Sequence, residues 1–119
     1  MERITFITHG GKDILLLDFS RLKANEVLQL IDPAKAVISG KPEKSILTLT
    51  DVTDLTFNSE VSERMKEFTA HNKPYVRASA IVGVTGLKRI IYNAVIAFSQ
   101  RQIATFGDRE AAKSWLAQQ

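Results

Sequence analysis

The stretch that decides the fold runs from Leu47 to Phe68 and reads "LTLTDVTDLTFNSEVSERMKEF". It begins as a run in which Leu and Thr alternate, passes through a loop of Thr, Asp and Asn, and continues as an amphipathic helix. Ser59 at the junction is followed by Glu60 and Glu63, a pattern typical of a helix N-terminus. The stretch therefore predicts a strand, a loop and a helix in succession.

The rest of the chain repeats this unit after an opening hairpin. Two β-rich runs flank "HGGK", whose glycines suit a tight turn. We expect strands at 3–8, 13–19, 45–52, 75–84 and 103–106, and helices at 22–39, 59–72, 84–101 and 109–119, the last capped by Asp108. Pro33 predicts a kink or a break in the first helix. The alternation indicates one α/β domain, 1–119, with a mixed, mostly parallel sheet and about four helices.

The two faces of the predicted sheet differ in polarity. Thr48 and Thr50 alternate with Leu47 and Leu49, and polar residues alternate with apolar ones in the next strand as well. One face is therefore aliphatic and the other partly polar. We expect the helices to crowd the aliphatic face.

Length and composition limit the class of protein. The 119 residues, of which 45% are hydrophobic and 24% charged, fit one globular domain. No apolar run reaches the length of a transmembrane helix, and the N-terminus has no secretory pattern. Cysteine is absent, as in many proteins of a reducing compartment. We therefore expect a cytoplasmic protein.

The charge is unevenly distributed. The net charge is only +3, yet no acidic residue occurs between Glu67 and Asp108, where Lys73, Arg77 and Arg101 lie among the cations. This predicts a basic face, which is either simply solvated or meets an acidic partner or anionic ligand. Nucleic acid is a poor candidate, because the excess is modest and no nucleic-acid-binding motif is present.

The sequence offers little for catalysis. Common hydrolase, metalloprotease and nucleotide-binding motifs are absent, and the two histidines, His9 and His71, have no partner nearby in sequence. Asp51 and Asp54 form a pair of carboxylates, but acids in a strand-to-helix loop are typical turn formers. We expect no enzyme, no cofactor and no metal site.

The loop after the third strand is the first candidate site. Its polar residues are Asp51, Thr53, Asp54, Asn58 and Ser59. We expect the Ser59 hydroxyl to cap the following helix. An exposed hydroxyl at a helix N-terminus is also a place where a phosphate would change what a partner meets.

A second candidate site is the turn before the third helix. Gly83, Thr85 and Gly86 lie between a strand and a helix N-terminus, and Lys88 and Arg89 follow. Backbone N–H groups and the helix dipole at such a terminus can hold an anion. The same glycines also suit a tight turn with close strand–helix approach. The sequence leaves both interpretations open.

The third helix carries more apolar residues than one buried face needs. We expect its broader face to be buried, which at 100° per residue comprises Leu87, Ile90, Ile91, Ala94, Val95, Ala97 and Phe98. Tyr92 and Ile96 project from the other side beside Arg89, which predicts an exposed ridge that resembles an interface hot spot. Such a ridge could serve a partner or a homodimer, or be ordinary surface.

These features together resemble a known family. The stretches "ILTLTDVTDLTFNSEV", "YVRASAIVGVTGLKRIIYNAVIAFS" and "IATFGDREAAKSWL" are similar to the STAS fold of SpoIIAA-like anti-sigma-factor antagonists, and to small bacterial STAS or CRAL-TRIO-like domains. The resemblance implies a non-enzymatic binding module. In the antagonists an Asp-Ser pair in this loop is phosphorylated on the serine, and Asn58 and Ser59 fall at the matching positions here.

Two functions remain for such a module. The leading hypothesis is protein–protein interaction through the surface from Asp51 to Ser59, with Tyr92 and Ile96 as a second contact. The alternative is a carrier of a small anionic or lipid-like ligand, held at residues 83–89 beneath the third helix. The carrier requires a cavity lined by Ile90, Ala94 or Phe98.

Overall fold

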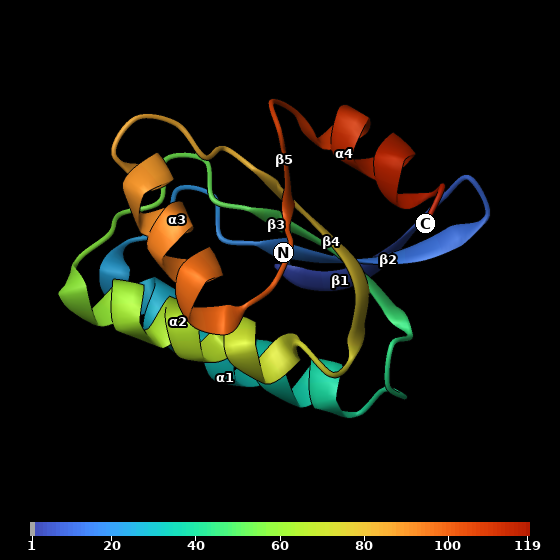
Figure 1. Cartoon of the computed structure of the whole chain (residues 1–119), viewed down its shortest axis with the longest axis horizontal. Helices are drawn as coiled ribbons and strands as arrows, with labels where there is room; N and C mark the ends of the chain where they lie inside the picture. The colour runs from blue at the N-terminus through green and yellow to red at the C-terminus, as the bar shows by residue number, and fades with distance from the viewer. Residues whose placement is uncertain (1) are drawn as a thin grey trace.

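The computed structural model describes residues 2–119 and has the predicted α/β architecture, with four helices and a five-stranded mixed sheet (Figure 1). Every predicted element is present; α2 has the predicted ends, and the others are shifted by a few residues at one end or both. In chain order they are β1 (Ile4–His9), β2 (Lys12–Asp18), α1 (Ala24–Ser39), β3 (Ile46–Asp51), α2 (Ser59–Asn72), β4 (Val76–Val82), α3 (Lys88–Ser99), β5 (Ala104–Phe106) and α4 (Arg109–Leu116).

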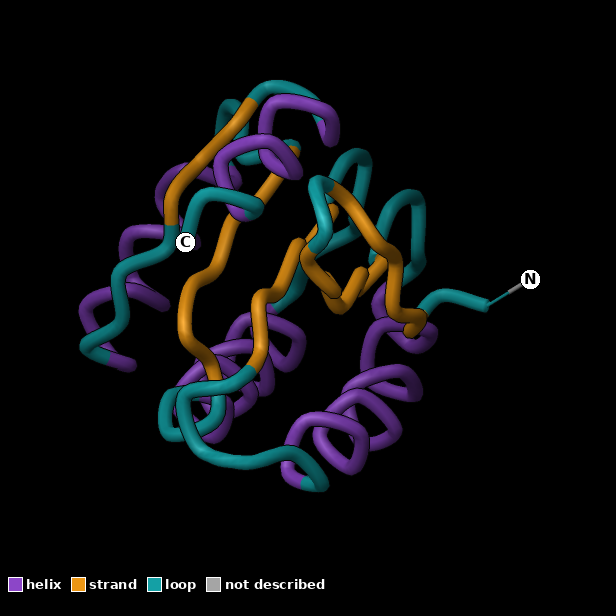
Figure 2. Tube along the Cα trace, turned by 90° about the vertical axis from the view of Figure 1, so that its right-hand side faces the viewer, coloured by secondary structure: helices purple, strands orange, loops and turns teal. Residues whose placement is uncertain are grey.

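The strands lie in the sheet in the same order as in the chain, β1-β2-β3-β4-β5. β1 pairs antiparallel with β2, and every later pair is parallel. Right-handed crossovers that all advance in one direction place their helices on one face of the sheet. This is where α1, α2 and α3 pack, and α4 covers the opposite face. Figures 1 and 2 show α1 and α2 below the strands and α4 above them.

The expectation that the helices crowd the aliphatic face is wrong. The three-helix layer covers the face with Thr48 and Ser79, and the aliphatic face of Leu47 and Leu49 meets α4 alone. Thr48 and Ser79 are cross-strand neighbours whose hydroxyls hydrogen-bond each other at 2.6 Å. Because each hydroxyl gives the other a partner, both side chains can be buried without water.

Of the two outcomes predicted at Pro33, a kink or a break, the break is wrong. Residues 24–39 form one helix that continues through Pro33. Pro33 is exposed, whereas Ile31 and Ala34 on either side of it lie in the core. The missing backbone hydrogen bond therefore falls on the solvent side, where water can satisfy the freed carbonyl.

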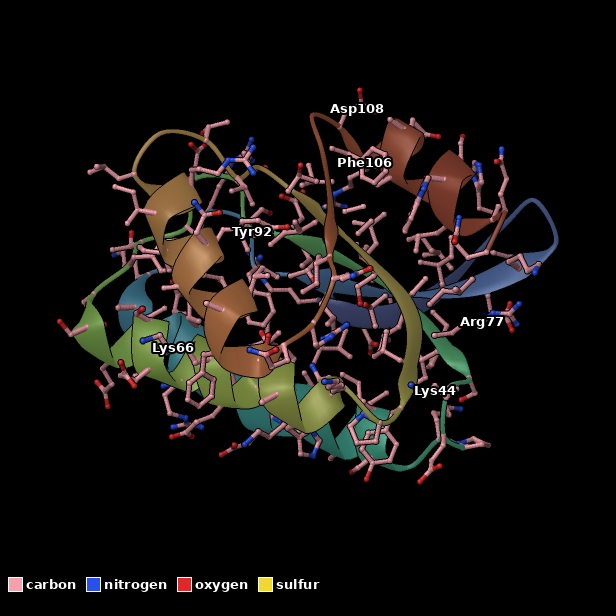
Figure 3. The ribbon with its side chains drawn as sticks, viewed as in Figure 1. Lys44, Lys66, Arg77, Tyr92, Phe106 and Asp108 are labelled. Carbon is pink, nitrogen blue, oxygen red and sulfur yellow. The ribbon has the colours of Figure 1, made fainter. Side chains whose placement is uncertain are left out.

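α4 is held at its start and along its length. The Asp108 side chain accepts a hydrogen bond from the backbone N–H of Ala111 at 2.8 Å, which confirms the predicted cap. Leu116 is fully buried, and the ring of Trp115 lies 5.7 Å from that of Phe106. Figure 3 shows Asp108 at the turn between β5 and α4, and Phe106 close to it. None of the described helices combines the length and apolar character needed to cross a membrane.

Candidate functional site

The carboxylate of Asp51 lies in the interior and is fully engaged. Asp51 is 6% exposed, and it accepts hydrogen bonds from Nε of Arg109 at 2.7 Å and from the backbone N–H of Thr53 at 2.9 Å. Arg109 also forms an ion pair with Asp18 at 3.1 Å. Asp51 therefore anchors α4 to the end of β3 and is not an exposed contact.

Asp18 lies beside this pair in a polar cluster. Burial raises the pKa of Asp18, but hydrogen bonds from the side chain and backbone of Ser20, with the charges of Arg109 and Arg3, outweigh it. The Ser20 hydroxyl donates to Asp18 at 2.5 Å. The pKa of Asp18 therefore lies below its ordinary value.

The structure brings two of the predicted loops into contact. Gly83 has φ of +94°, and a Cβ at this position would lie 2.5 Å from Oγ1 of Thr53. Only glycine combines this backbone conformation with so close an approach. The loops after β3 and β4 therefore meet at the carboxyl end of the parallel strands (Figure 1), with Asp54 exposed beside the contact.

The prediction that Ser59 caps α2 is wrong by one residue. Asn58 is the N-cap, and its side-chain oxygen accepts a hydrogen bond from the backbone N–H of Val61 at 2.8 Å. Ser59 is the first helical residue and is exposed. Asn and Ser are equally good N-caps, so the two assignments could not be separated by residue type.

The N-terminus of α3 lacks the geometry expected of an anion site. The backbone N–H groups of Lys88, Arg89 and Ile90 each donate at 3.1 Å to the carbonyl three residues earlier. These donors are therefore already used in a tight first turn. Gly86 has φ of +56°, so the glycines here serve the turn.

The predicted orientation of α3 is partly reversed: Ile91 and Val95 pack in the core as expected, but the other residues of the predicted buried face do not. Tyr92 and Ile96 point inward, and the Tyr92 hydroxyl donates to the carbonyl of Ile103. Figure 3 shows Tyr92 reaching from α3 towards β5. Leu87, Ile90 and Phe98 are instead exposed, by 80%, 67% and 58% of their surfaces.

The reversal has a physical reason. α3 is apolar on both sides, so its apolar periodicity predicts a stripe without saying which stripe meets the core. Tyr92 can lie inside because its hydroxyl finds a carbonyl there. Ala94 and Ala97 are exposed as well, and they complete an apolar stripe of the residues Leu87, Ile90, Ala94, Ala97 and Phe98. We call these five residues the α3 stripe.

A cavity of about 60 Å³ lies beneath α3. It is lined by residues of the sheet, α2 and the inner side of α3, Tyr92 and Ile96 among them. Ile90, Ala94 and Phe98, which the carrier hypothesis required as its walls, are outside it and exposed. A carrier site of that predicted form is therefore absent from the described residues.

Arg101 is the polar residue of this cavity that sequence reasoning missed. Its guanidinium donates to the backbone carbonyl of Thr69 at 3.3 Å and to the hydroxyl of Ser79. Burial lowers the pKa of Arg101 to about 10. A cationic residue that follows a helix is normally expected on the surface. The sequence feature that could have pointed to Arg101 was the stretch without acidic residues around it.

Residues 2–119 contain no group of three or more His, Cys, Asp or Glu side chains placed to hold a metal ion. No protein-family model matches the chain, and no curated protein or solved structure matches it. The functional argument therefore rests on the α/β fold, the α3 stripe and the cavity with Arg101.

Proposed function

We propose that this protein is a non-enzymatic, STAS-like binding module whose docking surface for protein is the α3 stripe. The observation that carries the proposal is the exposure of three large apolar side chains, Leu87, Ile90 and Phe98, on one side of one helix. Clustered exposed apolar residues of this kind mark interaction surfaces. The N-terminal hairpin and the strand–helix alternation support the STAS-like assignment, and the lack of cysteine supports a cytoplasmic location.

The partner that fits the stripe best is a second copy of the chain. Ala94 and Ala97 form a shallow middle with larger residues on either side, Ile90 towards one end and Phe98 towards the other. Two such helices crossing antiparallel about Ala94 would place Phe98 of one copy against Ile90 of the other. A two-fold interface uses the same patch on both subunits, and small central residues allow the helices to approach closely.

The charges of α3 support an antiparallel pair. Its first turn contains no acidic residue and its last turn no basic one, whereas Lys88 and Arg89 are at its start. This is the reverse of what the helix dipole favours in an isolated helix. In an antiparallel pair, the cations at the start of each helix would lie near the negative C-terminal end of the other.

The loop after β3 borders the proposed surface. The starts of α2 and α3 lie at the same end of the sheet (Figure 1), and Ser59 is exposed there. We include in the proposal that phosphorylation of Ser59 regulates docking. Ser59→Asp, which mimics the added charge, should weaken an association that Ser59→Ala preserves. Equal association of both variants would remove Ser59 from the proposal.

Light scattering tests the docking surface. We expect the wild-type protein to approach twice its 13.3 kDa chain mass as concentration rises, and the double variant Ile90→Ser/Phe98→Ser to stay at the chain mass. Phe6→Ser is the matched control, because Phe6 on β1 is 42% exposed and outside the stripe. Circular dichroism should show the same fold in all three. A wild-type protein that stays monomeric, or an unchanged mass in the double variant, would refute the second copy as partner.

A further inference from the structure

Arg101 separates the inner cavity from an open groove on the surface. The cavity measures about 60 Å³ and the groove about 670 Å³. Arg101, Ser79, Tyr92, Ile96 and Ile103 line both. The two spaces are therefore neighbours with a shared wall, and a molecule in the groove would meet the guanidinium directly.

The charge of Arg101 has no counter-ion in residues 2–119. Its two hydrogen bonds go to a carbonyl and a hydroxyl, which are neutral, and it forms no ion pair with a described carboxylate. A guanidinium has five N–H donors, so two bonds leave others unused. Burying a cation without a partner is costly, and a bound anion would offset that cost.

The hydroxyls next to Arg101 supply one more donor. Thr48 and Ser79 are 3% and 4% exposed, and they share one hydrogen bond of 2.6 Å. Two hydroxyls carry two protons and their mutual bond uses one. Ser79 also accepts from Arg101, which consumes no hydroxyl proton. Whichever hydroxyl donates, one proton of the pair remains without an acceptor among residues 2–119 and is available to a ligand oxygen.

The charged side chains of the groove are all cationic. Lys44, Lys73 and Arg77 line it together with Arg101, and none of its lining residues within 2–119 is Asp or Glu. Figure 3 shows Lys44 and Arg77 beside β4 at the amino end of the parallel strands. Cations gathered in a concave surface raise the local concentration of anions and speed their binding.

The inner cavity suits a short aliphatic group. Its walls include Met65, Phe68, Ile91 and Val95, and its volume of about 60 Å³ is small. Because a water molecule takes up about 30 Å³, the cavity has room for about two waters or an equally short carbon chain. A long lipid tail would not fit.

We propose that the groove and the cavity form one binding site for a small organic anion, in which a carboxylate or phosphate monoester group binds Arg101 and Ser79 and a short aliphatic chain enters the cavity. The site is independent of the α3 stripe, because it lies on the opposite side of the helix. Tyr92 and Ile96 then act as walls of the site.

The test is a titration of the full chain followed by two-dimensional NMR of its backbone amides. Butyrate, butyl phosphate and inorganic phosphate are the three probes. We expect butyrate or butyl phosphate to give saturable shifts at Ser79, Arg101 and Ile103, and inorganic phosphate to bind more weakly than butyl phosphate. Whichever of butyrate and butyl phosphate binds more tightly identifies the preferred headgroup.

Variants locate the site. Arg101→Gln should weaken binding about tenfold or more, since it removes a charge-assisted hydrogen bond. Arg21→Gln is the matched control, because Arg21 is an exposed arginine that lines neither space. The double variant Lys73→Gln/Arg77→Gln changes the groove and leaves the cavity walls as they are. It should weaken binding a few-fold, and its affinity should depend less on salt concentration than that of the wild type.

The results of this binding test do not depend on the result of the light-scattering test, so the two proposals can fail independently. Loss of binding in Arg101→Gln with an unchanged thermal melt, and retention in Arg21→Gln, would support the site. If Arg101→Gln does not fold, weaker binding by the groove variant than by Arg21→Gln supports it instead. Equal affinity of all variants, no saturable shifts, or inorganic phosphate as the tightest probe would overturn the proposal.

Discussion

Arg109, the first residue of α4, donates from Nε to Oδ2 of Asp51, the last residue of β3, over 2.7 Å. A terminal nitrogen of the same guanidinium lies 3.1 Å from Asp18 at the end of β2. One side chain therefore ties the C-terminal helix to two central strands. This contact fixes the start of α4 over the aliphatic face, which no other described helix covers.

Arg109→Gln should lower the free energy of unfolding by about 1–3 kcal/mol, because it leaves the buried Asp51 carboxylate without its cation. Urea unfolding followed by circular dichroism measures the change. Lys113→Gln is the control: Lys113 pairs with the exposed Glu110 at 3.1 Å on the same helix, and its loss should cost about 0.5 kcal/mol or less. Equal costs for the two variants would contradict the anchoring role of Arg109.

The lowered pKa of Asp18 predicts how the stability of the protein changes in acid. Its pKa in the folded protein lies below the ordinary 3.8, so the folded state holds this proton less tightly than the unfolded chain does. The contribution to stability is therefore complete well above pH 3.8, and it is lost as the pH falls below 3.8 through the folded value. Asp18→Asn should be less stable at neutral pH and lose less stability on acidification.

Urea unfolding at neutral pH and at stepped acidic pH checks this prediction. Asp54→Asn serves as the control, because Asp54 is exposed and Asn tolerates its left-handed φ of 56°. If the acid profile of Asp18→Asn matches that of the wild type, Asp18 is not the group responsible.

Asn58 and Ser59 should differ in their effect on stability. Asn58→Ala removes the hydrogen bond to Val61 and should cost about 1 kcal/mol. Ser59→Ala should change the free energy of unfolding by less than about 0.5 kcal/mol, since Ser59 is exposed in the first turn. Thermal melts of both variants provide the comparison, and a larger loss for Ser59→Ala would restore it as the cap.

The order and type of the elements followed from the sequence because each has a local signal. Alternating Leu and Thr at 47–50 predict a strand, and Asp108 before "REAAKSWL" predicts a capped helix. These signals depend on neighbours in the chain, so the packing of the whole domain does not change them. The ends of elements moved by a few residues, because terminal turns depend on tertiary contacts.

Two of the errors concern which side of an element faces inward. Helical periodicity predicts Tyr92 outside, because it lies opposite the broader apolar face of α3, but the carbonyl of Ile103, eleven residues away, satisfies its hydroxyl in the interior. Thr48 looked like a surface residue until Ser79, on the next strand, gave it a partner. Such pairings become visible only when the strands are placed side by side, so periodicity within one segment cannot reveal them.

Arg101 illustrates the same limit for the candidate site. Its surroundings come from Thr69 on α2 and Ser79 on β4, which precede it by 32 and 22 residues. The sequence did show the lack of acid between Glu67 and Asp108. What it could not show is that the Arg101 guanidinium lies at the mouth of a cavity without a counter-ion among the residues that the structure describes.

The match between chain order and strand order bears on how the domain is made. Each strand after the opening hairpin joins the edge left free by the one before it. The sheet can therefore grow from one side as the chain leaves the ribosome, and no strand has to wait for a later segment to be inserted beside it. α4 comes last, so until it docks, the nascent domain leaves its aliphatic face open to chaperones.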